Sequence, residues 1–146
     1  MSHVATVEVQ IKDLAALKAA CRELGMEFIE GQTTFRWYGR HVGDYPLPEG
    51  FDISDMGVCE HALRVKGDSN AYEVGVVKRR DGKPGYTLIY DFWKEGYGLE
   101  GVIGQQAMKL RQRYASQVAA KQARRQGYRV TQCYTADGSV RLVCTR

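Results

Sequence analysis

Three predicted strands joined by very short turns constrain the fold of this chain more than any other feature. The strands cover residues 59–66, 71–79 and 86–92. The connections at residues 67–70 and 81–85 consist mainly of Gly, Asp, Ser, Asn and Pro, a composition typical of turns. Because connections this short join antiparallel neighbours, the three strands predict an antiparallel meander.

A strand and a helix begin the chain. Residues 4–11 alternate between two faces as a half-buried strand does. Asp13 is a predicted N-cap, apolar residues follow at helical spacing, and Gly25 stands at the expected C-cap, so residues 14–24 form a predicted helix. Two further short strands are predicted at residues 26–29 and 33–38.

A long helix and a hairpin follow the meander. Apolar residues at helical spacing predict one helix over residues 99–126, which Gly127 ends. Residues 128–134 and 139–145 flank the pair Asp137-Gly138, a strong hairpin signal. The element order is therefore β-α-β-β-β-β-β-α-β-β. This order predicts a single α+β domain over residues 1–146, with two helices packed on one face of a largely antiparallel sheet.

Residues 39–57 differ from the rest of the chain in composition. Glycine, proline and acidic residues dominate the segment, which predicts a long, solvated acidic loop. Its carboxylates lack the fixed spacing of a calcium-binding EF-hand loop.

Charge is distributed very unevenly along the sequence. Residues 1–100 hold 12 Lys/Arg and 16 Asp/Glu, a net charge of −4, whereas residues 101–146 hold nine Lys/Arg and only one acid, a net charge of +8. Such polarity bears on the partners of a protein rather than on its fold.

The basic residues of the second predicted helix are candidates for binding. Lys109, Arg113 and Arg124 fall within roughly 60° of one another on that helix. Clustered cations without acids are typical of surfaces that contact phosphates or acidic partners. The alternative is a solvated helix whose last turns extend past the core. Trp93 and Tyr97 lie at a strand end and in a glycine-rich connection, so we expect both to be exposed and available to a partner.

Residues 96–101 match the pattern G-x-G-x-x-G between a predicted strand and a predicted helix. A dinucleotide site also needs an acid about 20 residues further on, and the chain has no acid between Glu100 and Asp137. The preceding strands form a meander rather than βαβ units, so a plain connection is the favoured interpretation. A third hypothesis, an enzyme that binds an anion at the start of this helix, requires the connection to be open.

No other motif indicates catalysis, a metal or a cofactor. Serine-nucleophile, Walker and H-E-x-x-H motifs are absent. The four cysteines, Cys21, Cys59, Cys133 and Cys144, lack the spacing of a zinc site and are interpreted as reduced, buried thiols that act as small apolar side chains. No apolar run reaches the roughly 20 residues of a membrane span, and no signal peptide is visible. We therefore expect no cofactor, no metal and no membrane contact, and a cytoplasmic location.

Several short motifs in order along the chain resemble the DUF1257 family, which includes the Ycf35-like proteins and bacterial and phage members. They lie at residues 1–3, 11–14, 126–128 and 137–142, and those closest to the phage-type members are at residues 72–77 and 91–93, with Lys109, Leu110 and Tyr114. The resemblance covers nearly the whole chain except residues 39–57. It implies a small accessory protein whose partner is an AAA-type ATPase, and it implies no catalytic residues.

Besides the enzyme hypothesis, these observations lead to two hypotheses of function, which we favour over it. The first is a non-enzymatic accessory or adaptor protein that binds a protein partner. The second is a nucleic-acid-binding protein that uses the basic C-terminal helix on phosphates. The sequence does not report the oligomeric state.

Overall fold

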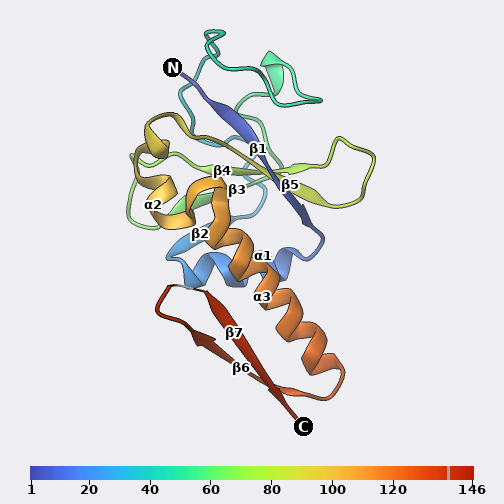
Figure 1. Ribbon diagram of the computed structural model, residues 1–146. Coiled ribbons are helices and arrows are strands. Elements are labelled where there is room, and N and C mark those ends of the chain that lie inside the picture. Colours follow the sequence, from blue (N-terminus) through green and yellow to red (C-terminus); the bar gives the residue numbers. More distant parts are fainter. Residues whose placement is uncertain (138) are drawn as a thin grey trace.

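The computed structural model, which describes residues 1–137 and 139–146, has an α+β fold (Figure 1). Its centre is a five-stranded antiparallel sheet with the strand order β1-β5-β4-β3-β2. The strands are β1 (Val4–Ile11), β2 (Met26–Ile29), β3 (His61–Val65), β4 (Val74–Lys78) and β5 (Tyr86–Asp91). The predicted meander is confirmed, because β3, β4 and β5 are antiparallel neighbours in chain order.

The helices cover one face of this sheet, as expected (Figure 1). They are α1 (Leu14–Glu23), α2 (Leu99–Ile103) and α3 (Met108–Arg125). The Tyr114 hydroxyl of α3 accepts hydrogen bonds from the backbone N–H groups of Lys12 and Asp13, at 3.0 and 3.2 Å. Because Asp13 is also the N-cap of α1, this contact fixes α3 at the start of α1.

The second predicted helix is not continuous. It breaks at Gly104, which has φ +82°, and Gln106 and Ala107 also take left-handed conformations in the 3-10 turn η3 (Gln105–Ala107). A Cβ on Gly104 would lie 3.0 Å from the backbone nitrogen of Lys109, so the turn is too tight for another residue. The predicted apolar face survives the break, since Leu99, Ile103, Ala107 and Leu110 are all fully buried.

The opposite face of the sheet is covered by the irregular segment 32–58, which contains the 3-10 turn η1 (Ile53–Asp55). Phe35 and Met56 are buried there against strand residues, and Trp37, Leu47 and Phe51 pack around them. The loop predicted at residues 39–57 is therefore only partly solvated: Leu47, Phe51 and Met56 form a second core with Phe35, whereas Val42 and Ile53 are exposed.

The predicted strand at residues 33–38 is also wrong. Only an isolated bridge between Thr34 and Val58 forms in this segment. Its backbone bonds instead to a loop carbonyl and to the buried Glu73: the N–H of Phe35 donates to Gly57 O at 2.9 Å, and the N–H of Arg36 donates to Glu73 Oε1 at 2.7 Å. Phe35 packs onto the sheet at Gly75, where a Cβ would come within 2.6 Å of the Phe35 ring.

The C-terminal hairpin forms a separate two-stranded sheet. It consists of β6 (Arg129–Tyr134) and β7 (Val140–Thr145), and it packs against α3 at the end of the molecule away from the main sheet (Figure 1). The hairpin prediction is confirmed for its strands, while Gly138 of the predicted turn lies outside the described residues.

Candidate functional site

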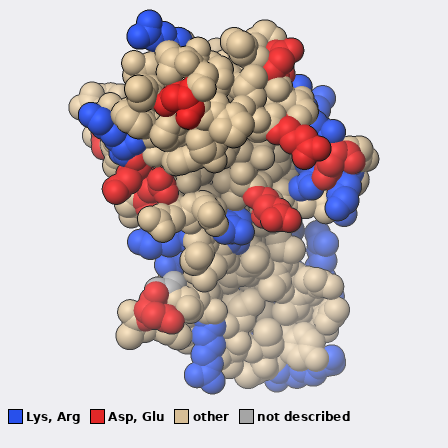
Figure 2. Space-filling view, turned by 45° about the horizontal axis from the view of Figure 1, so that its top comes forward, with Lys and Arg blue, Asp and Glu red and all other residues tan. Residues whose placement is uncertain are grey.

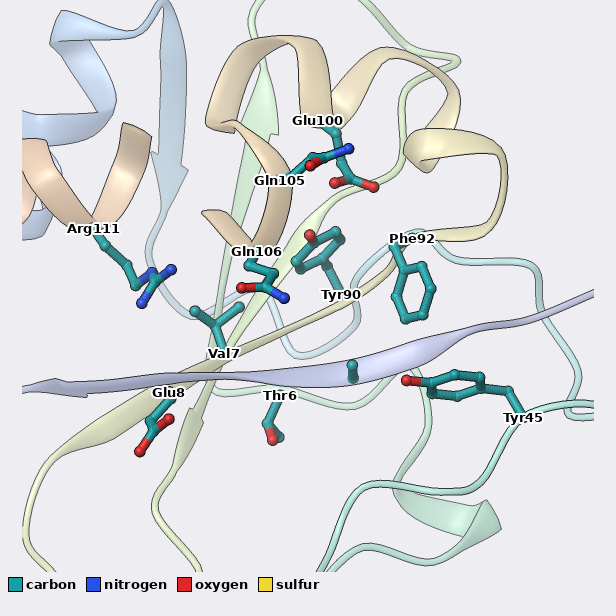
Figure 3. A pocket seen from close by; sticks show the side chains of 11 residues that line it. Thr6, Val7, Glu8, Tyr45, Tyr90, Phe92, Glu100, Gln105, Gln106 and Arg111 are labelled. Atoms are coloured by element: carbon teal, nitrogen blue, oxygen red, sulfur yellow. The ribbon is translucent and has the colours of Figure 1, made fainter. Parts of the chain in front are cut away.

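A hollow of about 530 Å³ lies along β1 on the helical side of the sheet (Figure 3). We call it the β1 pocket. Its size is within the range of sites that bind small molecules or single side chains. Strand, loop and helix residues line it: Ala5, Thr6, Val7, Glu8, Tyr45, Tyr90, Phe92, Glu100, Gln105, Gln106 and Arg111.

Polar side chains from the α2–α3 region form one wall of the β1 pocket. Figure 3 shows the Glu100 carboxylate beside Gln105 and above the Tyr90 hydroxyl, and the Arg111 guanidinium extending toward Val7 and Gln106. Burial raises the pKa of Glu100, while its hydrogen bond with Tyr90 opposes that shift. Burial, followed by the nearby Glu100 charge, raises the pKa of Tyr90 to about 12, so its hydroxyl is protonated at neutral pH.

Arg111 is the one cation of this wall. Its Nε atom is buried and has no hydrogen-bond partner in residues 1–137 and 139–146, and the guanidinium forms no ion pair with a described residue. A buried donor without an acceptor is destabilising by about 1–3 kcal/mol. The pocket therefore offers an unused cationic donor to an acceptor from outside.

Backbone strain is concentrated around the β1 pocket. Residues 94–97 form a left-handed turn inside η2 (Trp93–Gly98), with φ between +48° and +65°, and Gln106 and Ala107 repeat this conformation on the other side of α2. Left-handed conformation costs about 1–2 kcal/mol for each residue other than glycine. Strain of this kind is concentrated at functional sites in proteins, which makes this wall of the pocket a candidate site.

Asp91 holds this strained region to the rest of the chain. Its side chain is fully buried and accepts backbone hydrogen bonds from His3 and Trp93 at Oδ1 and from Tyr38 at Oδ2, at 2.9, 3.0 and 3.0 Å. One carboxylate thus joins the N-terminus, the second-core segment and the start of the left-handed turn. Sequence reasoning missed this role, because a carboxylate at a strand end does not show which backbone groups will surround it.

The G-x-G-x-x-G segment is closed. Gly96 is buried, a Cβ on it would lie 2.8 Å from Leu99 Cβ, and its carbonyl accepts the N–H of Tyr72 at 2.9 Å. The helix that follows, α2, has only five residues. This packing does not provide the open phosphate cradle that the enzyme hypothesis required.

The two aromatic candidates differ in exposure. Tyr97 is 45% exposed and packs one edge against Tyr72, with ring centroids 5.0 Å apart. Trp93 is half-buried, and its ring lies 5.0 Å from that of His3. The expected exposure therefore holds for Tyr97 and only partly for Trp93, and their role in binding stays a prediction.

The three basic candidates do not form one surface. Lys109 and Arg124 are exposed but lie 15 residues apart on α3, roughly 22 Å along its axis. Arg113 is used within the chain: its guanidinium lies 3.2 Å from Glu23 Oε2 and stacks over the Tyr134 ring, 4.1 Å from its centre. A shared phosphate contact by Lys109, Arg113 and Arg124 is therefore not supported by this geometry.

Arg124 instead comes together with three other arginines, at the far end of the molecule. Arg124 and Arg125 end α3, Arg129 begins β6, and the pairing of Arg129 with Thr145 brings Arg146 beside them. None of the four is ion-paired with an acid of the described chain. We call this cluster the basic end. The sequence signal was available in the run from Arg124 to Arg129, but Arg146 joins only through the hairpin register.

Figure 2 shows blue Lys and Arg side chains at the hairpin end, where red side chains are sparse, whereas red and blue side chains are interspersed over the rest of this face. Arg146 also stacks over Tyr128, with the guanidinium 4.4 Å from the ring centre. Stacking on tyrosine leaves the charge itself unneutralised.

The hairpin leaves backbone and apolar groups uncovered. β6 and β7 pair only with each other, so each has an unpaired outer edge. The face turned away from α3 is exposed along its whole length, and it carries Arg129, Thr131, Cys133, Arg141, Val143 and Thr145. A two-stranded sheet is marginally stable alone, and here its inner face is supported by α3.

No three His, Cys, Asp or Glu side chains in residues 1–137 and 139–146 gather into a group that could hold a metal ion. Within the same residues, no helix is both long and apolar enough to cross a membrane.

Comparison with known proteins identifies a family. In comparisons with curated proteins and with solved structures, no match is found. Residues 49–143 match the model of a family described as "Protein of unknown function (DUF1257)", and this match includes most of the pocket wall and nearly all of the hairpin. The description assigns no activity. Because the matched residues make up more than half of the sequence, the chain belongs to the DUF1257 family.

Proposed function

We propose that this protein is a non-enzymatic accessory protein that binds an acidic protein partner through its basic end and the adjoining hairpin. The observation that carries the proposal is the cluster of Arg124, Arg125, Arg129 and Arg146, which no acid of the described chain neutralises. Each of these cations is a charge that a partner can match, and matched charges accelerate association and select the partner.

A protein is favoured over a nucleic acid by the surroundings of the cluster. The exposed side chains include Tyr134 and Val143, and the outer edges of β6 and β7 present unpaired N–H and C=O groups. Protein interfaces bury apolar and aromatic side chains of this kind and can extend a sheet edge, whereas a phosphate backbone uses mainly the cations. An AAA-type ATPase is the partner class that family resemblance suggests. The proposal places the protein in the cytoplasm, of a bacterium or of a cell infected by a phage.

A nucleic acid is the second candidate, because a two-stranded ribbon has the dimensions that enter the major groove of DNA. The exposed face of the hairpin carries Arg129 and Arg141 among threonines, and these side chains can bond phosphates or base edges. In this candidate the ribbon and the basic end replace the surface on α3 that the sequence suggested.

Site-specific photo-crosslinking in the cells that contain the protein tests the proposal. A photoreactive residue replaces Val143, which is 38% exposed on the hairpin, and in a control it replaces Val42, which is 45% exposed in the segment 32–58. We expect a discrete protein adduct from position 143 that is absent from position 42. The adduct should disappear when Arg124, Arg125 and Arg129 are changed to alanine. Nucleic-acid adducts from position 143 would favour the second candidate, and identical adducts from both positions would contradict the proposed surface.

A further inference from the structure

The outer edge of β1 presents backbone groups that no strand pairs with. β1 is an end strand of the five-stranded sheet. The carbonyl of His3 accepts the N–H of Phe92 at 2.9 Å, and bonded pairs alternate along an antiparallel ladder. Ala5 and Val7 therefore bond to β5, and the N–H and C=O groups of Thr6 point outward, while Glu8 follows where the ladder becomes irregular. No backbone hydrogen bond from elsewhere in the described chain reaches Thr6 or Glu8.

Hollows flank this edge on both faces of the sheet. The β1 pocket lies on the helical face, and a second hollow of about 680 Å³ lies on the opposite face. Thr6, Val7 and Glu8 line both hollows. The far wall of the second hollow is formed by Glu49, Gly50, Phe51, Arg79, Arg80 and Asp81. The free edge therefore forms the floor of a channel whose walls come from the α2–α3 region and from the second-core segment.

We propose that the free edge of β1 binds an extended peptide of a partner protein by strand addition, with alternate peptide side chains in the two hollows and an acidic side chain facing Arg111. In strand addition, backbone hydrogen bonds hold the peptide and pockets for alternate side chains select its sequence. The surface is distinct from the basic end, so the two proposals stand or fall separately.

The charge of each hollow defines the peptide. In the β1 pocket, Arg111 has a buried Nε without a described partner, so a carboxylate would supply the missing acceptor. In the second hollow, Arg79 is ion-paired with Asp81 and Arg80 with Asp55, and Arg80 also stacks over Phe51 at 4.2 Å. These two arginines are already matched, and Glu8 and Glu49 also line this hollow, so an uncharged side chain packed beside Phe51 suits it better than an acidic one.

The channel suits a short segment rather than a second copy of the chain. The ladder between β1 and β5 shifts register between Val7 and Ile11, which ends the regular edge after about five residues. Glu8 places a charge on the edge, a feature that discourages sheets from pairing edge to edge. A second copy would also bring its own two walls against those of the first.

Selection from a library of short random peptides displayed on phage tests the proposal with the full chain. We expect selected peptides to contain an acid flanked by alternating apolar residues and to shift the amide resonances of Thr6 and Glu8 in NMR spectra. Thr6→Pro removes an outward N–H while leaving the β5 ladder intact, and it should weaken binding about tenfold. Arg111→Gln should weaken binding of the acidic peptide about tenfold. It should not weaken binding of the same peptide in which the acidic residue is replaced by its amide. Arg22→Gln, at an exposed position of α1, is the matched control.

Other outcomes would overturn the proposal. These are a library that yields no binder, peptides that shift the resonances of β6 and β7 instead, and peptides whose affinity is unchanged by both Thr6→Pro and Arg111→Gln. If Thr6→Pro fails to fold, the amide resonances that the peptide shifts and the comparison with Arg111→Gln still test the proposal. The variant Arg124→Ala/Arg125→Ala/Arg129→Ala should bind the peptides as the wild type does, which separates this result from a failure of the basic end.

Discussion

Replacing Asp91 tests whether one buried carboxylate holds the pocket region in place. Its side chain accepts three backbone N–H groups, from His3, Tyr38 and Trp93, at 2.9–3.0 Å. Asp91→Ala removes all three acceptors and leaves a small cavity. Each orphaned donor costs about 1–3 kcal/mol when it stays dry, and water can reach some of them in the variant, so we take about 1 kcal/mol each. With the cavity, the expected loss is about 4 kcal/mol in the free energy of unfolding.

Asp91→Asn removes the charge and one of the two acceptor oxygens without leaving a cavity. The amide keeps one oxygen, which can still accept from His3 and Trp93, but its NH2 group then faces the N–H of Tyr38. We expect a loss of about 2 kcal/mol, roughly half that of the alanine variant. A small domain has only about 5–15 kcal/mol of total stability, so both losses are large enough to measure.

Urea denaturation followed by circular dichroism provides the measurement for these variants. The matched control is Asp81→Asn, which removes an exposed carboxylate paired with Arg79 and should lower the free energy of unfolding much less than Asp91→Ala does. Asp91→Ala within about 1 kcal/mol of wild type would refute the reasoning. So would an asparagine variant as unstable as the alanine variant, because the hydrogen-bond count would then not set the stability.

Three further predictions concern other regions. Gln106→Gly should leave the free energy of unfolding unchanged or raise it by up to about 1 kcal/mol, because Gln106 has a left-handed backbone with φ +54°. Gln122→Gly, at an exposed position inside α3, should lower the free energy of unfolding by about 1 kcal/mol. Equal losses for the two variants in urea titrations would contradict the left-handed turn. The expected burial of the cysteines holds for Cys21 and Cys59 but is wrong for Cys133 and Cys144, which are exposed on the hairpin. Burial raises the pKa of the Cys21 and Cys59 thiols to about 12, so maleimide at neutral pH should label only Cys133 and Cys144 in mass spectra until denaturant is added. The hydrogen bond from Arg79 lowers the pKa of Asp81 from 3.8 to about 2. The ionised Asp81 therefore stabilises the fold above about pH 4, and this stabilisation is lost as the pH falls toward 2. An NMR titration of Asp81 should give a midpoint of about 2, and Arg79→Gln should move this midpoint back toward 3.8.

Local signals were sufficient for the elements whose neighbours are close in sequence. The turns at residues 67–70 and 81–85 predicted the pairing of β3, β4 and β5, because short connections leave few alternatives. The N-cap Asp13 predicted the start of α1, and its side chain does accept the N–H of Ala16, at 3.0 Å.

Long-range contacts determined what the sequence could not predict. A strand was predicted at residues 33–38, but the backbone of Phe35 and Arg36 bonds to Gly57 and Glu73, which lie far away in sequence. The helical spacing from Leu99 to Leu110 stayed in phase across Gly104, so periodicity did not reveal the break.

The candidate site was predictable in charge but not in position. The excess of basic residues after Gly101 predicted a positive region, and four arginines of this part of the chain gather at the basic end. Ion pairs between helices then removed two of its cations, since Arg113 contacts Glu23 and Lys121 contacts Asp13 at 2.8 Å. Which cations stay free depends on how α1 packs against α3, and helix packing of this kind is not visible in the spacing of charges along one helix.

Binding to anionic probes over a salt series tests the central claim, that the basic end binds an acidic partner, most directly. Fluorescence anisotropy would compare labelled poly-glutamate with labelled single- and double-stranded oligonucleotides, for the wild type and Arg124→Ala/Arg125→Ala/Arg129→Ala. A control variant, Arg40→Ala/Lys66→Ala/Lys83→Ala, loses the same charge from exposed positions elsewhere.

We expect poly-glutamate to bind the wild type and the control variant, and to bind the arginine variant much more weakly. If a duplex binds instead, four phosphate contacts would weaken it about a hundredfold between about 50 and 200 mM salt, which would favour the nucleic-acid candidate. No binding of any probe at low salt, or equal losses in the two triple variants, would contradict the account.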